Sequence, residues 1–240
     1  RRIFLDPEEL LAPQPGKGDA VGRFDRGGIH RRCVASDPAR TPAIRLRVPD
    51  GTVVTFDDGL RSVYSKVYPL LRAYDYPALV AVITDYVDMA PGRTIDYGYR
   101  PFGHDDFLTW DQLREMQRGG MEIGSHGVDH RMLAKLSPGR MLDEVRGSKQ
   151  ALERELGVPA RVISYPVGGP DAFNHDTVQA VREAGFDLAC SYVAGVSRPG
   201  PRTQYALPRL PVERHMDMPW FQAMMAMPEL FTYASRLRTG

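Results

Sequence analysis

The sequence has little cysteine, no long hydrophobic run and almost no net charge. Its two cysteines, Cys33 and Cys190, lie far apart and lack the Cys-x-x-Cys spacing of a metal site, so one disulfide and two free thiols both stay open. No apolar stretch reaches the roughly 18 residues of a membrane span, so we expect no transmembrane segment. The 31 basic and 30 acidic residues are mixed along the chain, and because no basic block is present we expect no nucleic-acid partner.

What the sequence does have is a regular alternation of strand-like and helix-like segments. Its 240 residues, 42% of them hydrophobic, fit one α/β domain with a sizeable core. Alternation of this kind predicts a parallel sheet or barrel with right-handed crossovers. Residues 1–50, punctuated by Gly and Pro, predict an irregular segment with one strand-like alternation at 44–48. The expected strands cover residues 53–56, 78–84, 121–124, 161–165, 186–192 and 207–212.

Several helix boundaries carry local signals. Thr109 and Gln112 have the spacing of a capping box, and a second helix is expected to begin at Ser137-Pro138 and to end at Gly157. Asp176 is the expected cap of a third helix. The last helix, which is rich in Met and interrupted at Pro228, is expected to pack its Met residues into the core.

The first polar motif follows the first expected strand. Residues 53–56 are β-branched and aromatic, and they stop at Asp57, Asp58 and Gly59. The carboxyl ends of parallel strands form the ligand crevice of α/β folds, so both carboxylates are expected on the floor of a cleft. Adjacent carboxylates repel each other and are expensive to desolvate, which favours a bound cation over a plain turn.

A second polar motif follows the strand predicted at 121–124. His126 and His130 stand four residues apart, so on a helical turn both imidazoles would project from one face and could bind one ion. Two His and one Asp leave coordination places open, which is typical of a catalytic metal site. The second Asp is then free to act as a base in metal-assisted hydrolysis, with the metal lowering the pKa of water towards about 7. Backbone N–H groups of 166–169 are candidate oxyanion donors, although a plain β-α turn explains this segment equally well.

A long segment from Asp88 to Leu108 has few signs of regular structure. It carries Tyr97, Tyr99 and His104, and we expect part of it to form a wall of the cleft, with the tyrosines contacting substrate. Packing of the rings onto the barrel is the alternative.

These motifs resemble those of the polysaccharide deacetylases with a NodB-homology domain, carbohydrate esterase family 4. Thr55 to Gly59 is similar to the first motif of that family, and Ser125 to His130 to its second. The resemblance covers roughly residues 50–215, so we assign 51–240 to the deacetylase domain and 1–50 to a segment packed on it. It implies an α/β fold, a distorted (β/α) barrel of about seven parallel strands. By the same resemblance Asp57 is the catalytic base, and the ligands of a divalent metal, most often Zn²⁺, are Asp58, His126 and His130.

The third motif of the family departs from its usual pattern here. In the family an Arg often stands two residues before the proline of this motif and braces the catalytic base. In this chain the proline is Pro166, and Ser164 stands where that Arg would be. Tyr165 and Val167 flank Pro166. Tyr165 is expected to bind substrate, and the backbone N–H of Val167 is expected to contact the oxyanion. The Asp-plus-Trp fourth motif is not visible near 191–195.

The general acid is the least defined role. His215 lies in the region of the fifth motif, after the last expected strand, and is our candidate because a protonated donor must assist departure of the amine. The alternatives are His30, His104 and an acid supplied by an N-terminal element missing from this chain, whereas His175, beside the cap of a predicted helix, is expected at the surface.

The resulting hypothesis is a metal-dependent hydrolase that removes N-acetyl groups from an amino-sugar polysaccharide similar to poly-N-acetylglucosamine. Its polymer substrate implies an extracytoplasmic location, periplasmic or secreted. The alternatives are hydrolysis of another amide or of O-acetyl esters on a glycan, and a catalytically weak carbohydrate-binding protein. The oligomeric state is left open by the sequence.

Overall fold

The structure is a computed structural model that describes residues 53–96, 100–196, 200–201, 203–213 and 215–232. The irregular segment expected at 1–50 and the strand-like alternation at 44–48 lie outside these residues.

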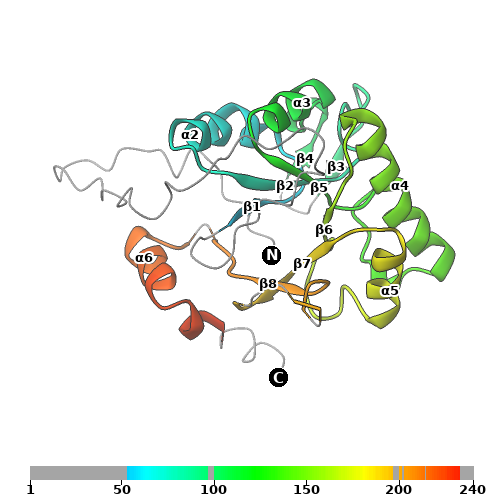
Figure 1. Cartoon of the computed structure of the whole chain (residues 1–240). Coiled ribbons are helices and arrows are strands. Elements are labelled where there is room, and N and C mark those ends of the chain that lie inside the picture. The colour runs from blue at the N-terminus through cyan, green and yellow to red at the C-terminus, as the bar shows by residue number, and fades with distance from the viewer. Residues whose placement is uncertain (1–52, 97–99, 197–199, 202, 214, 233–240) are drawn as a thin grey trace, which may run out of the picture.

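Six parallel strands form the main sheet in the described part of the chain, in the order β1-β2-β5-β6-β7-β8. Figure 1 shows the sheet curling from β1 round to β8, with helices on its outer side. The predicted α/β class and distorted (β/α) barrel are confirmed, with six paired strands where the sequence suggested about seven. The strands are β1 Val54–Phe56, β2 Ala78–Val82, β5 Glu122–Ser125, β6 Val162–Ser164, β7 Leu188–Ala194 and β8 Leu207–Arg209.

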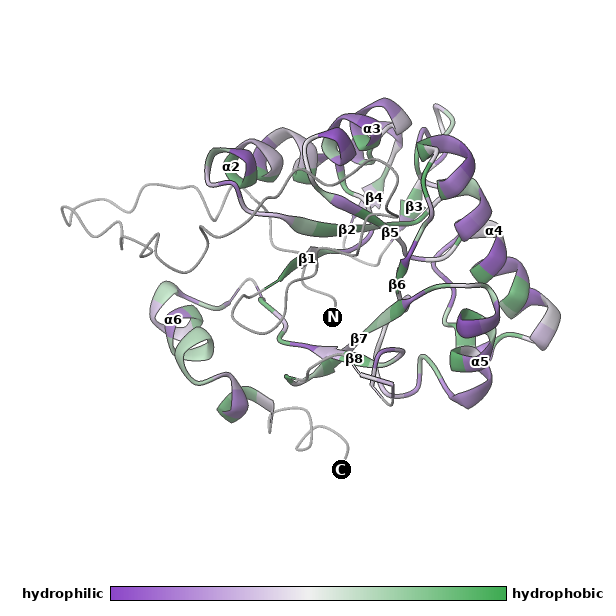
Figure 2. Ribbon diagram, in the orientation of Figure 1, coloured by the Kyte–Doolittle hydropathy of each residue, from purple (hydrophilic) through white to green (hydrophobic). Residues whose placement is uncertain are grey.

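The helices between β2 and β7 cover the outer face of the sheet because each buries one apolar side against it. In Figure 2 the outer helices are mostly hydrophilic outward, while the central strands are hydrophobic. All five residues of β2 are buried, as expected for a strand covered on both faces. The helices are α2 Tyr68–Ala73, preceded by the short π-helical turn Val63–Val67, then α3 Trp110–Arg118, α4 Pro138–Leu156, α5 His175–Glu183 and α6 Met218–Ala226.

The predicted helix boundaries are correct in two cases and wrong in one. Thr109 and Gln112 form the expected capping box at the start of α3. The helix α4 begins after Ser137 and ends at Gly157, whose φ of 69° is left-handed. The cap of α5 is Asn174 rather than Asp176, because the Asn174 side chain accepts the N–H of Thr177 at 2.9 Å.

The methionines of α6 do not pack as predicted. Met224 is buried, but Met218 and Met225 are exposed, as is Met227 just after the helix. The helix is apolar on nearly every side, so one face alone can reach the barrel and the other remains open.

The segment between β2 and α3 is more ordered than its composition suggests. It contains a two-stranded antiparallel pair, β3 Ile95–Asp96 with β4 Pro101–Phe102, and a 3₁₀ turn at His104–Asp106. Phe102 and Phe107 anchor it in a buried cluster.

The first and last strands of the sheet are joined by side chains. In the described residues β1 pairs only with β2, and β8 only with β7. Arg209, at the end of β8, crosses to β1 and donates hydrogen bonds to Thr55 Oγ1 at 3.0 Å and to Asp57 Oδ1 at 2.9 Å. The site described next therefore lies where the barrel is closed by hydrogen bonds between side chains.

Across the described residues, no helix has both the length and the apolarity needed to cross a membrane.

Candidate active site

The Asp-Asp-Gly turn after β1 buries one carboxylate almost completely. Asp58 is 2% exposed and has a φ of 73°, an uncommon value for a residue with a side chain. Gly59 follows at φ 76°, and a Cβ there would lie 3.0 Å from Val82 Cγ1. The turn therefore requires Gly at this position, and it holds Asp58 in a strained conformation of the kind found at functional sites.

His126 and His130 both reach Asp58, but not from a helix. The structure has an irregular loop here, with left-handed φ values of 79° at Gly127 and 66° at His130. The helical turn predicted from their spacing is wrong, because residues at left-handed angles do not continue a right-handed helix. The two rings still converge, with centroids 4.9 Å apart.

These three side chains have the geometry of a metal site. Asp58 Oδ1 lies 3.3 Å from His126 Nε2 and 3.4 Å from His130 Nε2. Donors around a tetrahedral ion with bonds of about 2.1 Å are about 3.4 Å apart. Asp58 Oδ1 is buried and accepts no hydrogen bond. A buried carboxylate oxygen normally has a partner, and a bound cation would be that partner here. The donor set and its spacing fit a divalent metal, and this is the one cluster of its kind among the described residues.

The tautomer of His126 also suits metal binding. His126 Nδ1 donates to the Ser164 carbonyl at 2.8 Å, so Nε2, which faces Asp58, is the ring nitrogen available to a cation. Burial lowers the pKa of His126, but the carboxylates of Asp57 and Asp58 more than offset this effect and raise it. The pocket therefore favours positive charge, which a bound cation also satisfies.

Asp57, the expected base, is held by residues from two distant strands. Arg209 donates to both of its oxygens, Nη1 to Oδ1 at 2.9 Å and Nη2 to Oδ2 at 2.7 Å, and Ser164 Oγ donates to Oδ2 at 3.1 Å. Burial raises the pKa of Asp57, but the Arg209 guanidinium, His126 and the Ser164 hydroxyl together outweigh burial and hold the pKa well below its usual range. Asp57 is therefore ionised and fixed in orientation.

Every N–H of Arg209 has a partner. Its Nε donates to the Ser191 carbonyl at 2.7 Å, and the two terminal nitrogens share Asp57, Thr55 and Ser164. Sequence reasoning missed this residue. The signal was indirect, since Ser164 stands where the family often has a bracing Arg, but nothing in Leu-Pro-Arg at 207–209 marks it as the replacement.

The turn after β6 presents a backbone donor. Val167 has a φ of 65°, which is strained for a β-branched residue, and its N–H donates no hydrogen bond to any described residue. Gly168 follows at φ 64°, where a Cβ would lie 2.7 Å from Tyr192 N. The Tyr165 side chain is 1% exposed, and its hydroxyl donates to the Tyr205 carbonyl. A buried ring cannot contact a polymer, so any role of Tyr165 in the site is limited to holding this turn.

A polar cavity of about 360 Å³ adjoins His130, one of the three candidate metal ligands. Residues of the segment between β2 and α3 form part of its wall, which agrees with the expected cleft position of that segment. Tyr97 and Tyr99 lie outside the described residues, so their substrate contacts stay a prediction. The cavity is lined by Tyr86, Arg93, Ile95, Asp96, Asp129, His130 and Arg131.

The candidate general acids occupy different places. His215 lies beyond β8 with its side chain 57% exposed, its Nδ1 3.3 Å from Glu213 Oε2 and its ring edge against Trp220. His104 pairs through Nδ1 with the Met89 carbonyl. His30 lies outside the described residues, and the role of His215 stays a prediction.

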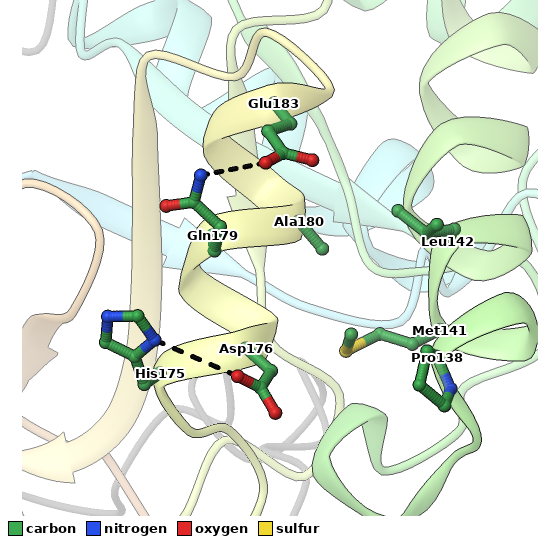
Figure 3. A pocket seen from close by; sticks show the side chains of 8 residues that line it. All are labelled: Pro138, Met141, Leu142, His175, Asp176, Gln179, Ala180 and Glu183. Carbon is green, nitrogen blue, oxygen red and sulfur yellow. Dashed lines mark hydrogen bonds and ion pairs between the residues drawn. The ribbon is translucent and has the colours of Figure 1, made fainter.

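A second hollow, of about 210 Å³, lies in the outer layer between α4 and α5 (Figure 3). His175 and Asp176 form an exposed ion pair of 3.8 Å at its rim, and the apolar part is made by α4 residues such as Met141. His175 is thus a surface residue, as expected, and this hollow holds none of the predicted site residues.

Comparison with known proteins places this geometry in a family. The family model described as polysaccharide deacetylase matches residues 48–189. The putative polysaccharide deacetylase YxkH of Bacillus subtilis (strain 168) is 30% identical over 165 residues, which cover 69% of this chain and 52% of that protein. The poly-beta-1,6-N-acetyl-D-glucosamine N-deacetylase of Staphylococcus aureus (strain MSSA476) is 25% identical over 166 residues, covering 65% of this chain and 52% of that protein.

A solved structure, the Streptococcus pyogenes deacetylase PplD in complex with acetate, is similar with a TM-score of 0.61 and 26% identity, covering 72% of this chain and 69% of that one. The chain spans about half the length of the two curated relatives described above. The matched region contains Asp57, Asp58, His126 and His130, and stops before Arg209. The chain belongs to the polysaccharide deacetylase family.

Proposed function

We propose that this chain is a metal-dependent hydrolase that removes N-acetyl groups from an amino-sugar polysaccharide of the poly-N-acetylglucosamine type. One observation carries the proposal: a buried carboxylate oxygen without a hydrogen bond lies 3.3 Å and 3.4 Å from two imidazole nitrogens, directly beside a second, braced carboxylate. The first carboxylate suits metal binding and the second suits proton transfer.

The chain's own residues divide the remaining work. Asp58, His126 and His130 would hold the cation, most simply Zn²⁺, which when bound polarises the acetyl carbonyl and makes water acidic enough to attack at neutral pH. Asp57 accepts the proton of the attacking water, and Arg209 and Ser164 keep its carboxylate ionised and oriented.

Two further groups complete the reaction. The Val167 N–H stabilises the negative charge that develops on the acetyl oxygen, since a preorganised backbone donor needs no reorganisation during the reaction. His215 donates a proton to the departing amine, which is a poor leaving group without it.

The substrate assignment is supported by a relative whose name specifies poly-beta-1,6-N-acetyl-D-glucosamine. A polymer of this kind is processed outside the cytoplasm, so we propose a periplasmic or secreted location.

The test is acetate release by the zinc-loaded protein from a panel of N-acetylated and O-acetylated glycans, with Asp57→Asn as the inactive control. Release from N-acetylated oligomers supports the proposal. Release from O-acetylated glycans alone makes the chain an esterase, and binding of glycans without release of acetate makes it a carbohydrate-binding protein.

A further inference from the structure

The loop that carries the two histidines is fixed on both sides by hydrogen bonds to its backbone. On one side the residues after β2 hold the carbonyls: Thr84 N–H donates to Gly127 O at 3.1 Å and Asp85 N–H to Val128 O at 3.0 Å. The Tyr86 hydroxyl donates to Asp129 O at 3.3 Å. The N–H groups of Val128 and Asp129 point to the opposite side, towards α4.

One buried carboxylate of α4 accepts two of those N–H groups. Glu144 is 7% exposed, and its Oε2 accepts from Val128 N at 2.8 Å and from Asp129 N at 3.2 Å. A Cβ on Gly127 would lie 3.1 Å from the same oxygen, so the carboxylate sits directly on the loop. Successive N–H groups around a left-handed residue form a concave anion site, and here the chain fills that site with its own side chain.

The next turn of α4 supports the same loop. Gly147 lets α4 approach the loop closely, because a Cβ at this position would lie 3.2 Å from Val128 Cγ2. Ser148 Oγ accepts from Ser125 Oγ at 2.7 Å, and Ser125 Oγ in turn accepts from Gly127 N at 3.1 Å. Glu144, Gly147 and Ser148 thus form one face of α4 that holds the loop between the histidines.

We propose that Glu144 is a positioning residue of the metal site, which anchors the loop so that His126 and His130 both point at Asp58. The proposal rests on the metal site proposed above. It follows from the conformation of the loop: His130 is held at a left-handed φ of 66°, which is strained for a residue with a side chain, and the backbone keeps this shape only while its partly buried N–H groups are satisfied. Without the negative charge of this carboxylate the N–H groups of Val128 and Asp129 are held less strongly, and the loop relaxes away from the arrangement that aligns both imidazoles.

The test measures zinc affinity rather than turnover. Glu144→Gln keeps the size of the side chain and one acceptor oxygen, but it removes the charge that makes both hydrogen bonds to the loop about twice as strong as neutral ones. We expect this variant to bind Zn²⁺ about 10- to 100-fold more weakly in competition with a chromophoric chelator. Glu153→Gln is the matched control, because Glu153 lies on the same helix and also accepts a backbone N–H, that of Ala160 at 3.2 Å, away from the loop. We expect this control to bind Zn²⁺ as the wild type does.

A second variant covers the case in which Glu144→Gln does not fold. Gly147→Ala improves the helix propensity of α4 by about 1 kcal/mol, so α4 itself is not weakened, while its methyl group presses on Val128. We expect Gly147→Ala to weaken zinc binding as well, by less than Glu144→Gln does.

The outcomes separate the two proposals. Wild-type affinity in both Glu144→Gln and Gly147→Ala, or an equal loss in Glu153→Gln, overturns the positioning role and leaves the metal site intact. A wild-type protein that binds no Zn²⁺ overturns the metal site, and the positioning role with it.

Discussion

Arg209 is the residue whose replacement should change the site most without touching a metal ligand. Its side chain is 14% exposed, and that of Asp57 is 21% exposed, so the ion pair between them is largely buried. Arg209→Met keeps a long apolar side chain and removes all five N–H donors. Asp57 then keeps Ser164 as its remaining described partner.

The size of the effect follows from the burial of the pair. Removal of one partner leaves an uncompensated buried charge, which reduces the free energy of unfolding by about 3–5 kcal/mol. For a domain of this size each kcal/mol lowers Tm by about 2–4 °C, so we expect Arg209→Met to melt about 6–20 °C below the wild type. Arg209→Lys should recover only part of this difference, because an ammonium cannot donate two parallel bonds to one carboxylate.

The measurements are thermal unfolding followed by circular dichroism and acetate release from an N-acetylated oligomer. We expect kcat to fall about 100-fold, since Asp57 loses its fixed orientation while the substrate and metal contacts remain. Arg154→Met is the control, because Arg154 forms an exposed pair with its neighbour Glu155, and it should change stability by less than about 0.5 kcal/mol. A variant of Arg209 with wild-type Tm and kcat would refute the role assigned to this ion pair.

Four other predictions follow from the same structure. Asp58→Asn should lose bound zinc while Asp57→Asn keeps it and loses turnover; equal metal content in both, measured by elemental analysis, contradicts these roles. Burial raises the pKa of Glu122, so its ionised form destabilises the fold; Glu122→Gln should be more stable than wild type in urea at pH 7, and the difference should vanish as the pH falls below the ordinary Glu value of about 4.3. Burial also raises the pKa of the Cys190 thiol to about 11, so in a variant with this single cysteine maleimide should react only after unfolding, and rapid labelling of the native protein would be inconsistent with the buried thiol. His215→Ala should retain zinc, lower kcat and remove the basic limb of the pH–rate profile, and an unchanged profile would assign the proton to another donor.

The sequence by itself determined those features that depend on a few adjacent residues. Strand ends, the capping box at Thr109 and the Gly157 stop are local, because hydrogen bonds and backbone preferences act within one or two turns. The two polar motifs were also visible, since each lies within six residues and directly follows a strand. Their convergence could be expected from the rule that parallel strands end on the same side of a sheet.

Tertiary structure alone decided how those motifs are held. The partner of Asp57 is 152 residues away in sequence, on the last strand of the barrel, and no local pattern marks Arg209 as that partner. The conformation between His126 and His130 was mispredicted because a carboxylate on α4 and the carbonyl partners after β2 impose left-handed angles that helical spacing does not anticipate. The residue types of the site can thus be identified from short motifs. The ion pair and the hydrogen bonds that fix their geometry form only when the sheet curls and its first and last strands come together.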